Sequence, residues 1–207
     1  MDGTLLDSES LSTKSTEFAF QEVLGRKLTG DENSRLIGRP VKKVLKKWFP
    51  DDGDEIYRVG TDHFETIVDE VAPFPGVRDM LQLTAEHYRM ALVTSSQRKY
   101  AEKMLNLTGM RGYFEFIVAQ EDTVYQKPDP EPVLLALRRM GLSGDQCIFV
   151  GDQPYDITAG REAGLITVGA VWGSGDMETL SYYHPDKIIH DPHLLIEFLE
   201  SVSGKKH

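Results

Sequence analysis

The stretch CIFVGDQPYD, residues 147–156, decides the fold. It opens on the apolar run 147–150, passes directly into Gly151-Asp152, and carries a second acid at Asp156. A short apolar run bounded by turn residues indicates a buried strand, and acidic residues stabilise the N-terminus of a helix. The stretch therefore predicts a strand, a turn and a helix, with two carboxylates at the carboxyl end of the strand.

The same alternation of apolar runs and helices extends over residues 73–207. We expect further strands over 90–93, 114–118 and 166–168, and helices over about 76–87, over 131–140 and after Asp156. Apolar runs that alternate with helices of about ten residues are typical of βαβ units, whose parallel strands are covered by helices on both faces. Ligands of such sheets bind at the carboxyl ends of the strands.

Residues 8–72 show no strand pattern and are predicted to be helical throughout. Apolar residues recur at helical spacing on one face of residues 41–49, with lysines opposite, and again over 56–71. Such stripes are typical of amphipathic helices. With an earlier helix that carries Phe20, they predict a small helical bundle, and the Pro- and Gly-rich cluster at 73–76 marks the linker that follows it.

Composition excludes several classes of protein. The 207 residues include 33 acidic and 23 basic ones, for a net charge of −10, which disfavours binding to nucleic acid or to an anionic membrane. The lone Cys147 excludes a disulfide framework and a multi-cysteine metal site. No apolar run has the length of a membrane span and no signal-peptide pattern occurs at the N-terminus, so we expect a cytoplasmic protein without a membrane partner.

Four short segments fall where a ligand of the predicted sheet would bind: Asp2-Gly3-Thr4, Thr94-Ser95, Lys127-Pro128-Asp129-Pro130 and 151–156. Together they supply carboxylates for a hard divalent cation, hydroxyl and backbone donors for an anion, and one ammonium. That set suits a phosphoryl group, because a metal offsets the carboxylates and a lysine offsets the charge of the transferring group. Each segment alone also fits a structural role as a turn, a helix cap or a stiff loop. Their joint order on the strand ends favours a site.

In this order the segments closely resemble the motifs of the haloacid-dehalogenase-like superfamily of phosphohydrolases. Asp2-Gly3-Thr4 is similar to the end of its first motif, Asp-x-Asp-Gly-Thr, and Thr94 resembles its second motif. Lys127 resembles the third motif, and Gly151-Asp152-x-x-x-Asp156 resembles the fourth.

The resemblance implies an α/β fold with a Rossmann-like parallel sheet core, formed by residues 1–7 and 73–207. A small α-helical cap domain, residues 8–72, would be inserted after the first motif. Longer similarities are to the branch of phosphoglycolate phosphatases and bacterial inorganic-pyrophosphate hydrolases, and they cover 107–109, 127–134, 159–164 and 170–173.

The resemblance also assigns roles to the charged residues. Asp2 matches the general acid/base, and its backbone carbonyl would bind Mg²⁺. Asp152 would ligate Mg²⁺ directly. Lys127 would neutralise the nucleophile and the transferring group, and Asp156 would orient the waters of the metal or Lys127.

The polar neighbours of these residues would bind phosphate. The resemblance implies that Thr94 donates to the phosphoryl oxygens, together with backbone N–H groups near Gly3 and Ser95 and the ammonium of Lys127.

Two cationic residues of the predicted cap are candidates for substrate contact. Gly38-Arg39-Pro40 opens a cap helix, and Arg39 or Lys42 would meet the distal part of an anionic substrate. The alternative is that both are solvated helix charges. Tyr125 and Trp172, near the expected edge of the site, are interpreted as packing residues.

The first aspartate of the first motif, the nucleophile of the family, would stand one residue before Met1, on the apolar central strand of the sheet. A parallel sheet without that strand leaves two rows of backbone groups unpaired. We therefore expect the natural chain to begin several residues upstream. The chain as printed is expected to show negligible turnover and at most to retain binding of Mg²⁺ or phosphate.

The expected activity is Mg²⁺-dependent hydrolysis of a small phosphorylated metabolite, such as phosphoglycolate or pyrophosphate, through an aspartyl-phosphate. One alternative is a phosphotransferase of the β-phosphoglucomutase type. Another is a non-catalytic relative that binds phosphate or a partner protein. We expect a monomer or a weak homodimer.

Overall fold

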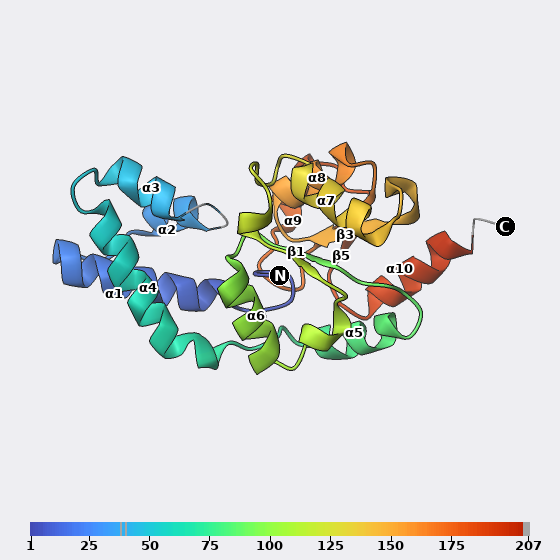
Figure 1. The fold of residues 1–207 in the computed structure, drawn as a ribbon, viewed down its shortest axis with the longest axis horizontal. Coiled ribbons are helices and arrows are strands. Elements are labelled where there is room, and N and C mark those ends of the chain that lie inside the picture. Colours follow the sequence, from blue (N-terminus) through green and yellow to red (C-terminus); the bar gives the residue numbers. More distant parts are fainter. Residues whose placement is uncertain (38, 40, 205–207) are drawn as a thin grey trace. The chain divides into compact units, whose positions relative to one another are not determined.

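The computed structural model describes residues 1–37, 39 and 41–204, and the chain divides into two compact units. The first, here called the core unit, consists of Met1–Asp7 and the chain from Pro73 onward. The second, here called the helical unit, consists of Ser8–Ala72. Figure 1 shows the elements of both units.

The core unit alternates strands with helices, as the apolar runs predict. Its strands are β1 (Leu92–Val93), β2 (Ile117–Val118), β3 (Ile148–Gly151), β4 (Ile166–Ala170) and β5 (Lys187–Ile189). Its helices are α5 (Val77–Ala85), α6 (Arg98–Leu107), α7 (Glu131–Met140), α8 (Pro154–Glu162), α9 (Met177–Tyr182) and α10 (Leu194–Ser203), with 3₁₀ turns η2 (Arg111–Tyr113), η3 (Gln120–Asp122) and η4 (Gly144–Gln146). The predicted helix over 131–140 coincides with α7.

The named strands pair only in parallel, which confirms the predicted strand direction. β1 pairs with β2, with Leu92 opposite Ile117. β3, β4 and β5 form a second sheet, in which Val150 lies opposite Val168. In the described part of the chain the strands therefore form two parallel sheets, where the family resemblance led us to expect one sheet. The reason is that none of the named strands pairs with both β1 and β3.

The two sheets share one apolar core. Helix α7 packs against β1 and β2 and also contacts α8, which covers β3 and β4. Phe149 of β3 packs against Val93 and Val118 of the first sheet. The same ring packs against the cluster that includes Val133 of α7 and Leu165 ahead of β4. Phe149 therefore packs against the apolar clusters on both sides of α7.

Three elements near the C-terminus were missed from the sequence, namely β5, α9 and α10. β5 has three residues, and its first, Lys187, is exposed. A run this short shows no alternation to detect, and its place in the sheet depends on pairing with β4. α9 has six residues, which is too short for a helical stripe to stand out.

The helical unit consists of α1 (Glu9–Leu24), α2 (Gly30–Leu36), α3 (Val41–Trp48), α4 (Gly53–Ile67) and the 3₁₀ turn η1 (Val68–Glu70). Its core is formed by Ala19, Phe20, Leu36, Leu45 and Ile56. The apolar face predicted for residues 41–49 packs against this core, and α1 packs against α4, which crosses it in the view of Figure 1. The predicted amphipathic bundle is therefore confirmed.

A search for membrane-spanning helices found none. Over the residues that the structure describes, every helix is too short or too polar to cross a bilayer.

Candidate active site

Residues 2–4 lie at the carboxyl ends of both β1 and β3. The Oγ1 of Thr94, which directly follows β1, donates a hydrogen bond to Asp2 Oδ2 over 3.1 Å. The Oγ1 of Thr4 donates to Asp152 Oδ1, and Asp152 directly follows β3. Segments that are about 90 to 150 residues apart in the chain therefore meet at one edge of the core unit, where the parallel topology places a ligand site.

Glycine is required at position 3 of this loop. Gly3 has a φ of 72° and its N–H donates to the Leu6 carbonyl over 3.0 Å. A Cβ at this position would clash with the carboxylate of Asp152. The N–H of Gly3 thus closes the turn, and phosphate binding by backbone groups near Gly3 stays a prediction.

Trp172 holds the loop from the other side. Its Nε1 donates to the Thr4 carbonyl over 2.8 Å, and the neighbouring Ser174 N–H donates to the Gly3 carbonyl over 2.9 Å. The interpretation of Trp172 as a packing residue was thus incomplete. That of Tyr125 was wrong, because its exposed fraction is 64%.

Asp152 is the most buried acid of the site, with 3% of its surface exposed. It accepts one hydrogen bond from Thr4 and one from Gln153 Nε2, the latter over 2.8 Å. Burial, followed by the nearby charge of Asp156, raises the pKa of Asp152. The hydrogen bond from Thr4, the ammonium of Met1 and the hydrogen bond from Gln153 act in the opposite direction and favour the ionised form.

Lys127 and Asp156 form a buried ion pair. Their side chains are 8% and 6% exposed, and Nζ lies 2.6 Å from Oδ1. The other carboxylate oxygen of Asp156 accepts from the Gln153 N–H over 3.0 Å, at the N-terminus of α8. Asp156 therefore both accepts from the backbone at the start of α8 and pairs with Lys127.

The Thr94-Ser95-Ser96 segment surrounds Asp2 with hydroxyl groups. Ser96 Oγ donates to Asp2 Oδ2 over 2.9 Å, and the Ser96 N–H donates to Thr94 Oγ1 over 3.1 Å. Ser95 lies between them and is partly exposed. Sequence reasoning missed Ser96, although its place one residue beyond the Thr94-Ser95 pair was a signal.

The donor set of the site fits Mg²⁺. Among residues 1–37, 39 and 41–204, no three His, Cys, Asp or Glu side chains come together as a ligand group. Mg²⁺ does not need such a group, because it keeps several waters and binds one or two carboxylates together with substrate phosphates. Asp152 supplies a buried carboxylate, and the hydrogen bonds it accepts come from the neutral groups of Thr4 and Gln153.

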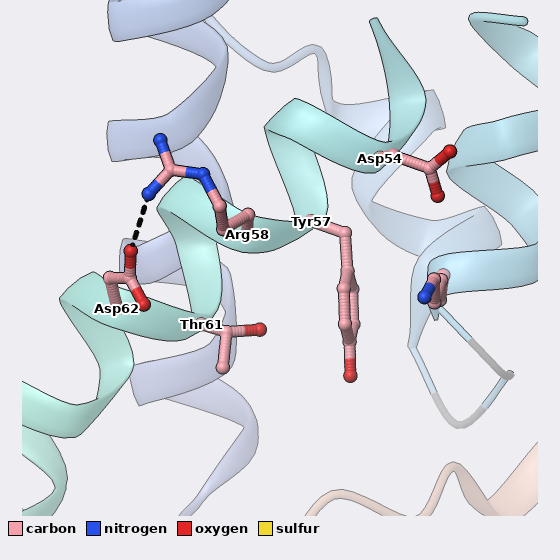
Figure 2. Close-up of a pocket in the computed structure, with 6 residues that line it drawn as sticks. Asp54, Tyr57, Arg58, Thr61 and Asp62 are labelled. Atoms are coloured by element: carbon pink, nitrogen blue, oxygen red, sulfur yellow. Dashed lines mark hydrogen bonds and ion pairs between the residues drawn. The ribbon is translucent and has the colours of Figure 1, made fainter.

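Arg39 and Lys42 belong to the helical unit, and both are exposed. Their neighbours Gly38 and Pro40 lie outside the described residues. Lys42 Nζ stands 5.6 Å from the ring centroid of Tyr57. It lines a surface pocket of about 480 Å³, together with residues of α4 that Figure 2 shows: Asp54, Tyr57, Arg58, Thr61 and Asp62.

The pocket brings side chains of both charges together. Arg58 is paired with Asp62 over 2.8 Å, an interaction drawn in Figure 2, and Asp54 is paired with Lys46 over 2.7 Å. Lys42 lies over the Tyr57 ring. A hydrogen bond from Lys46, and then the charges of Lys46 and Lys42, lower the pKa of Asp54.

Parallel strands with carboxylates, hydroxyls and a buried lysine at their carboxyl ends define an α/β enzyme of the phosphoryl-handling class. The family model for haloacid dehalogenase-like hydrolases matches residues 1–170. The chain belongs to this family.

Individual relatives agree with this assignment. The chain is 31% identical over 191 residues to a pyrophosphatase PpaX from Bacillus velezensis, covering 91% of this chain and 88% of the relative. It is 29% identical over 206 residues to a phosphoglycolate phosphatase from Aquifex aeolicus, covering 97% and 94%. The fold is similar to that of a haloacid dehalogenase-like family hydrolase from Streptococcus pneumoniae, with a TM-score of 0.85, 23% identity, and coverage of 96% and 95%. Within its family the chain therefore falls in the branch of PpaX and phosphoglycolate phosphatases.

Proposed function

We propose that the protein is a Mg²⁺-dependent phosphohydrolase of pyrophosphate or of a small phosphate monoester such as phosphoglycolate. The observation that carries the proposal is the meeting of Asp2, Thr94, Asp152 and the Lys127–Asp156 pair at one edge of the core unit. Relatives named as pyrophosphatases and as a phosphoglycolate phosphatase support the choice of substrates.

Asp2 is the proposed general acid/base. It would protonate the leaving oxygen and later take a proton from the attacking water. The hydroxyls of Thr94 and Ser96 both donate to its Oδ2 and hold the carboxylate at this edge of the core unit. Thr94 and the backbone N–H of Ser95 are the proposed donors to the phosphoryl oxygens.

Asp152 and the backbone carbonyl of Asp2 are the proposed ligands of Mg²⁺. When bound, the metal would offset the negative charge of the phosphoryl group. Lys127 would neutralise the same group from the other side, and Asp156 holds its ammonium in place over 2.6 Å. Because that pair is buried, little water screens the ammonium.

The proposed nucleophile is the first aspartate of the family's Asp-x-Asp-Gly-Thr motif. Its carboxylate would displace the leaving oxygen from phosphorus, and water would then release phosphate from the aspartyl-phosphate.

The test is release of phosphate from a panel of substrates in the presence of Mg²⁺. The panel holds pyrophosphate, phosphoglycolate, sugar phosphates and 4-nitrophenyl phosphate. Phosphate release is measured on the chain as printed and on an extended chain. The extension is an apolar strand that ends in aspartate directly before Met1. An extension with asparagine at that position is the matched control. We expect activity in the aspartate form, and its loss in the asparagine form and in Asp152→Asn. Absence of phosphate release from every substrate by the folded aspartate form would refute the proposal, and conversion of β-glucose 1-phosphate to glucose 6-phosphate would identify a phosphotransferase instead.

We further propose that Arg39 and Lys42 bind the distal anionic group of the substrate. The support is that both are exposed cations and that Lys42 lines a pocket. Lys42→Ala should raise the KM for phosphoglycolate and leave that for 4-nitrophenyl phosphate unchanged, since the latter has no distal anion. Lys43→Ala, one position along the same exposed stretch, is the matched control. Equal effects on both substrates would contradict this role.

A further inference from the structure

Gln153 links the two carboxylates of the fourth motif. Its side-chain Nε2 donates to Asp152 Oδ2 over 2.8 Å. Its backbone N–H donates to Asp156 Oδ2 over 3.0 Å. Its carbonyl accepts from the Asp156 N–H over 2.9 Å. The backbone of Gln153 is thus held at the start of α8, and the amide of its side chain is turned back to the residue before it.

The carboxylate of Asp152 is held at both oxygens. Thr4 donates to Oδ1 and Gln153 donates to Oδ2. Gly3 approaches the same carboxylate so closely that a Cβ would clash with it. Each carboxylate oxygen offers about two acceptor positions, so one on each oxygen is left for a cation or for water. The direction of those remaining positions is set by the two donors.

A neutral amide suits this place chemically. It stabilises the ionised carboxylate that a metal requires, and it brings no positive charge that would repel the cation. Partners that orient a ligating carboxylate commonly change metal affinity by about 10- to 100-fold when they are removed. The contact between Asp156 and the start of α8 does not use the amide, because Asp156 accepts from the backbone N–H of Gln153, the residue before the helix.

We propose that Gln153 is a positioning residue for the divalent-cation site and that it acts by fixing the direction of the Asp152 carboxylate. This rests on the proposed role of Asp152 as a Mg²⁺ ligand. Gln153 contacts no substrate in this assignment; its effect passes through Asp152.

The test is the binding of Mg²⁺ itself, measured by isothermal titration on the metal-free chain and by the shift in Tm that Mg²⁺ produces. Gln153→Met keeps the length of the side chain and removes the donor. Gln146→Met is the matched control, because Gln146 lies just ahead of β3, at the opposite end of the strand, where its Oε1 accepts from Ser143. We expect the Kd for Mg²⁺ to rise about 10- to 100-fold in Gln153→Met and to stay unchanged in Gln146→Met. Asp152→Asn should abolish binding.

Two results would overturn the inference. The first is a folded Gln153→Met variant that binds Mg²⁺ like the wild type, while Asp152→Asn does not bind it. A fall in the metal-free Tm of Gln153→Met, without weaker Mg²⁺ binding, would count as this same result. That result would leave the proposed function intact. The second is a wild-type chain that binds no Mg²⁺, which would overturn this inference together with the metal site of the proposed function. A wild-type chain that binds Mg²⁺ but releases no phosphate would contradict the proposed function alone. In that case, weaker Mg²⁺ binding by Gln153→Met would still support the present inference.

Discussion

Breaking the Lys127–Asp156 pair from one side should destabilise the core unit strongly. The two groups are 2.6 Å apart and their side chains are 8% and 6% exposed. Removing one partner of a buried pair leaves an uncompensated charge and costs about 3–5 kcal/mol. In Lys127→Met, Asp156 retains the hydrogen bond from the Gln153 N–H, so we expect the lower end, about 3 kcal/mol.

The reverse change should have a similar effect. Asp156→Asn leaves the ammonium of Lys127 buried without its carboxylate partner, 5.8 Å from the centroid of the Phe149 ring. The double variant removes both charges, so its cost should fall below the sum of the single costs by about 0.5–3 kcal/mol, as for contacting residues in a double-mutant cycle.

The assay is urea unfolding followed by tryptophan fluorescence. The chain has two tryptophans, Trp48 in the helical unit and Trp172 in the core unit. In a Trp48→Phe background, the fluorescence of Trp172 reports the core unit alone. Glu115→Gln breaks an exposed pair with Arg89 in the same unit and is the matched control. If Lys127→Met costs no more than this control, or if the double variant is simply the sum of the single ones, the reasoning from burial is refuted.

Three further predictions concern single residues. Gly3→Ala should destabilise the core unit by about 1–2 kcal/mol for the left-handed backbone alone, with an added clash against Asp152; unchanged urea unfolding would contradict this. Phe20→Ala empties a site that is fully buried in the helical unit and should cost about 3–5 kcal/mol there, as measured by the fluorescence of that unit's tryptophan. Glu32 accepts hydrogen bonds from Arg26, which lower its pKa from 4.5 to about 2. Because the folded-state pKa is depressed, ionised Glu32 stabilises the helical unit above about pH 4.5, and this contribution is lost as the pH falls toward 2. The difference in unfolding free energy between wild type and Glu32→Gln should shrink over that range, and a difference independent of pH would contradict the assignment.

Local patterning predicted much of the fold because it acts over short distances. The stripe over residues 41–49 packs against the helical core, and the apolar run at 147–150 contains three residues of β3. Such elements carry their burial pattern in their own residues. β5 and α9 do not, because they are short and depend on neighbours for their pairing and burial. The division of the strands into two sheets depends likewise on which strands pair. Strand pairing cannot be predicted from the composition of the individual strands.

By itself the sequence determined which groups stand at the strand ends. Each of these residues follows an apolar run or precedes a helix: Thr94, Lys127, Asp152 and Asp156. Parallel topology brings such positions to one edge of the sheet. Only the tertiary structure decided how they are held. The amide of Gln153, the hydroxyl of Ser96 and the indole N–H of Trp172 each reach a site residue. The physical reason is that hydrogen bonding depends on where a donor points. That direction is set by packing between segments far apart in the chain, and residue type and spacing do not contain it.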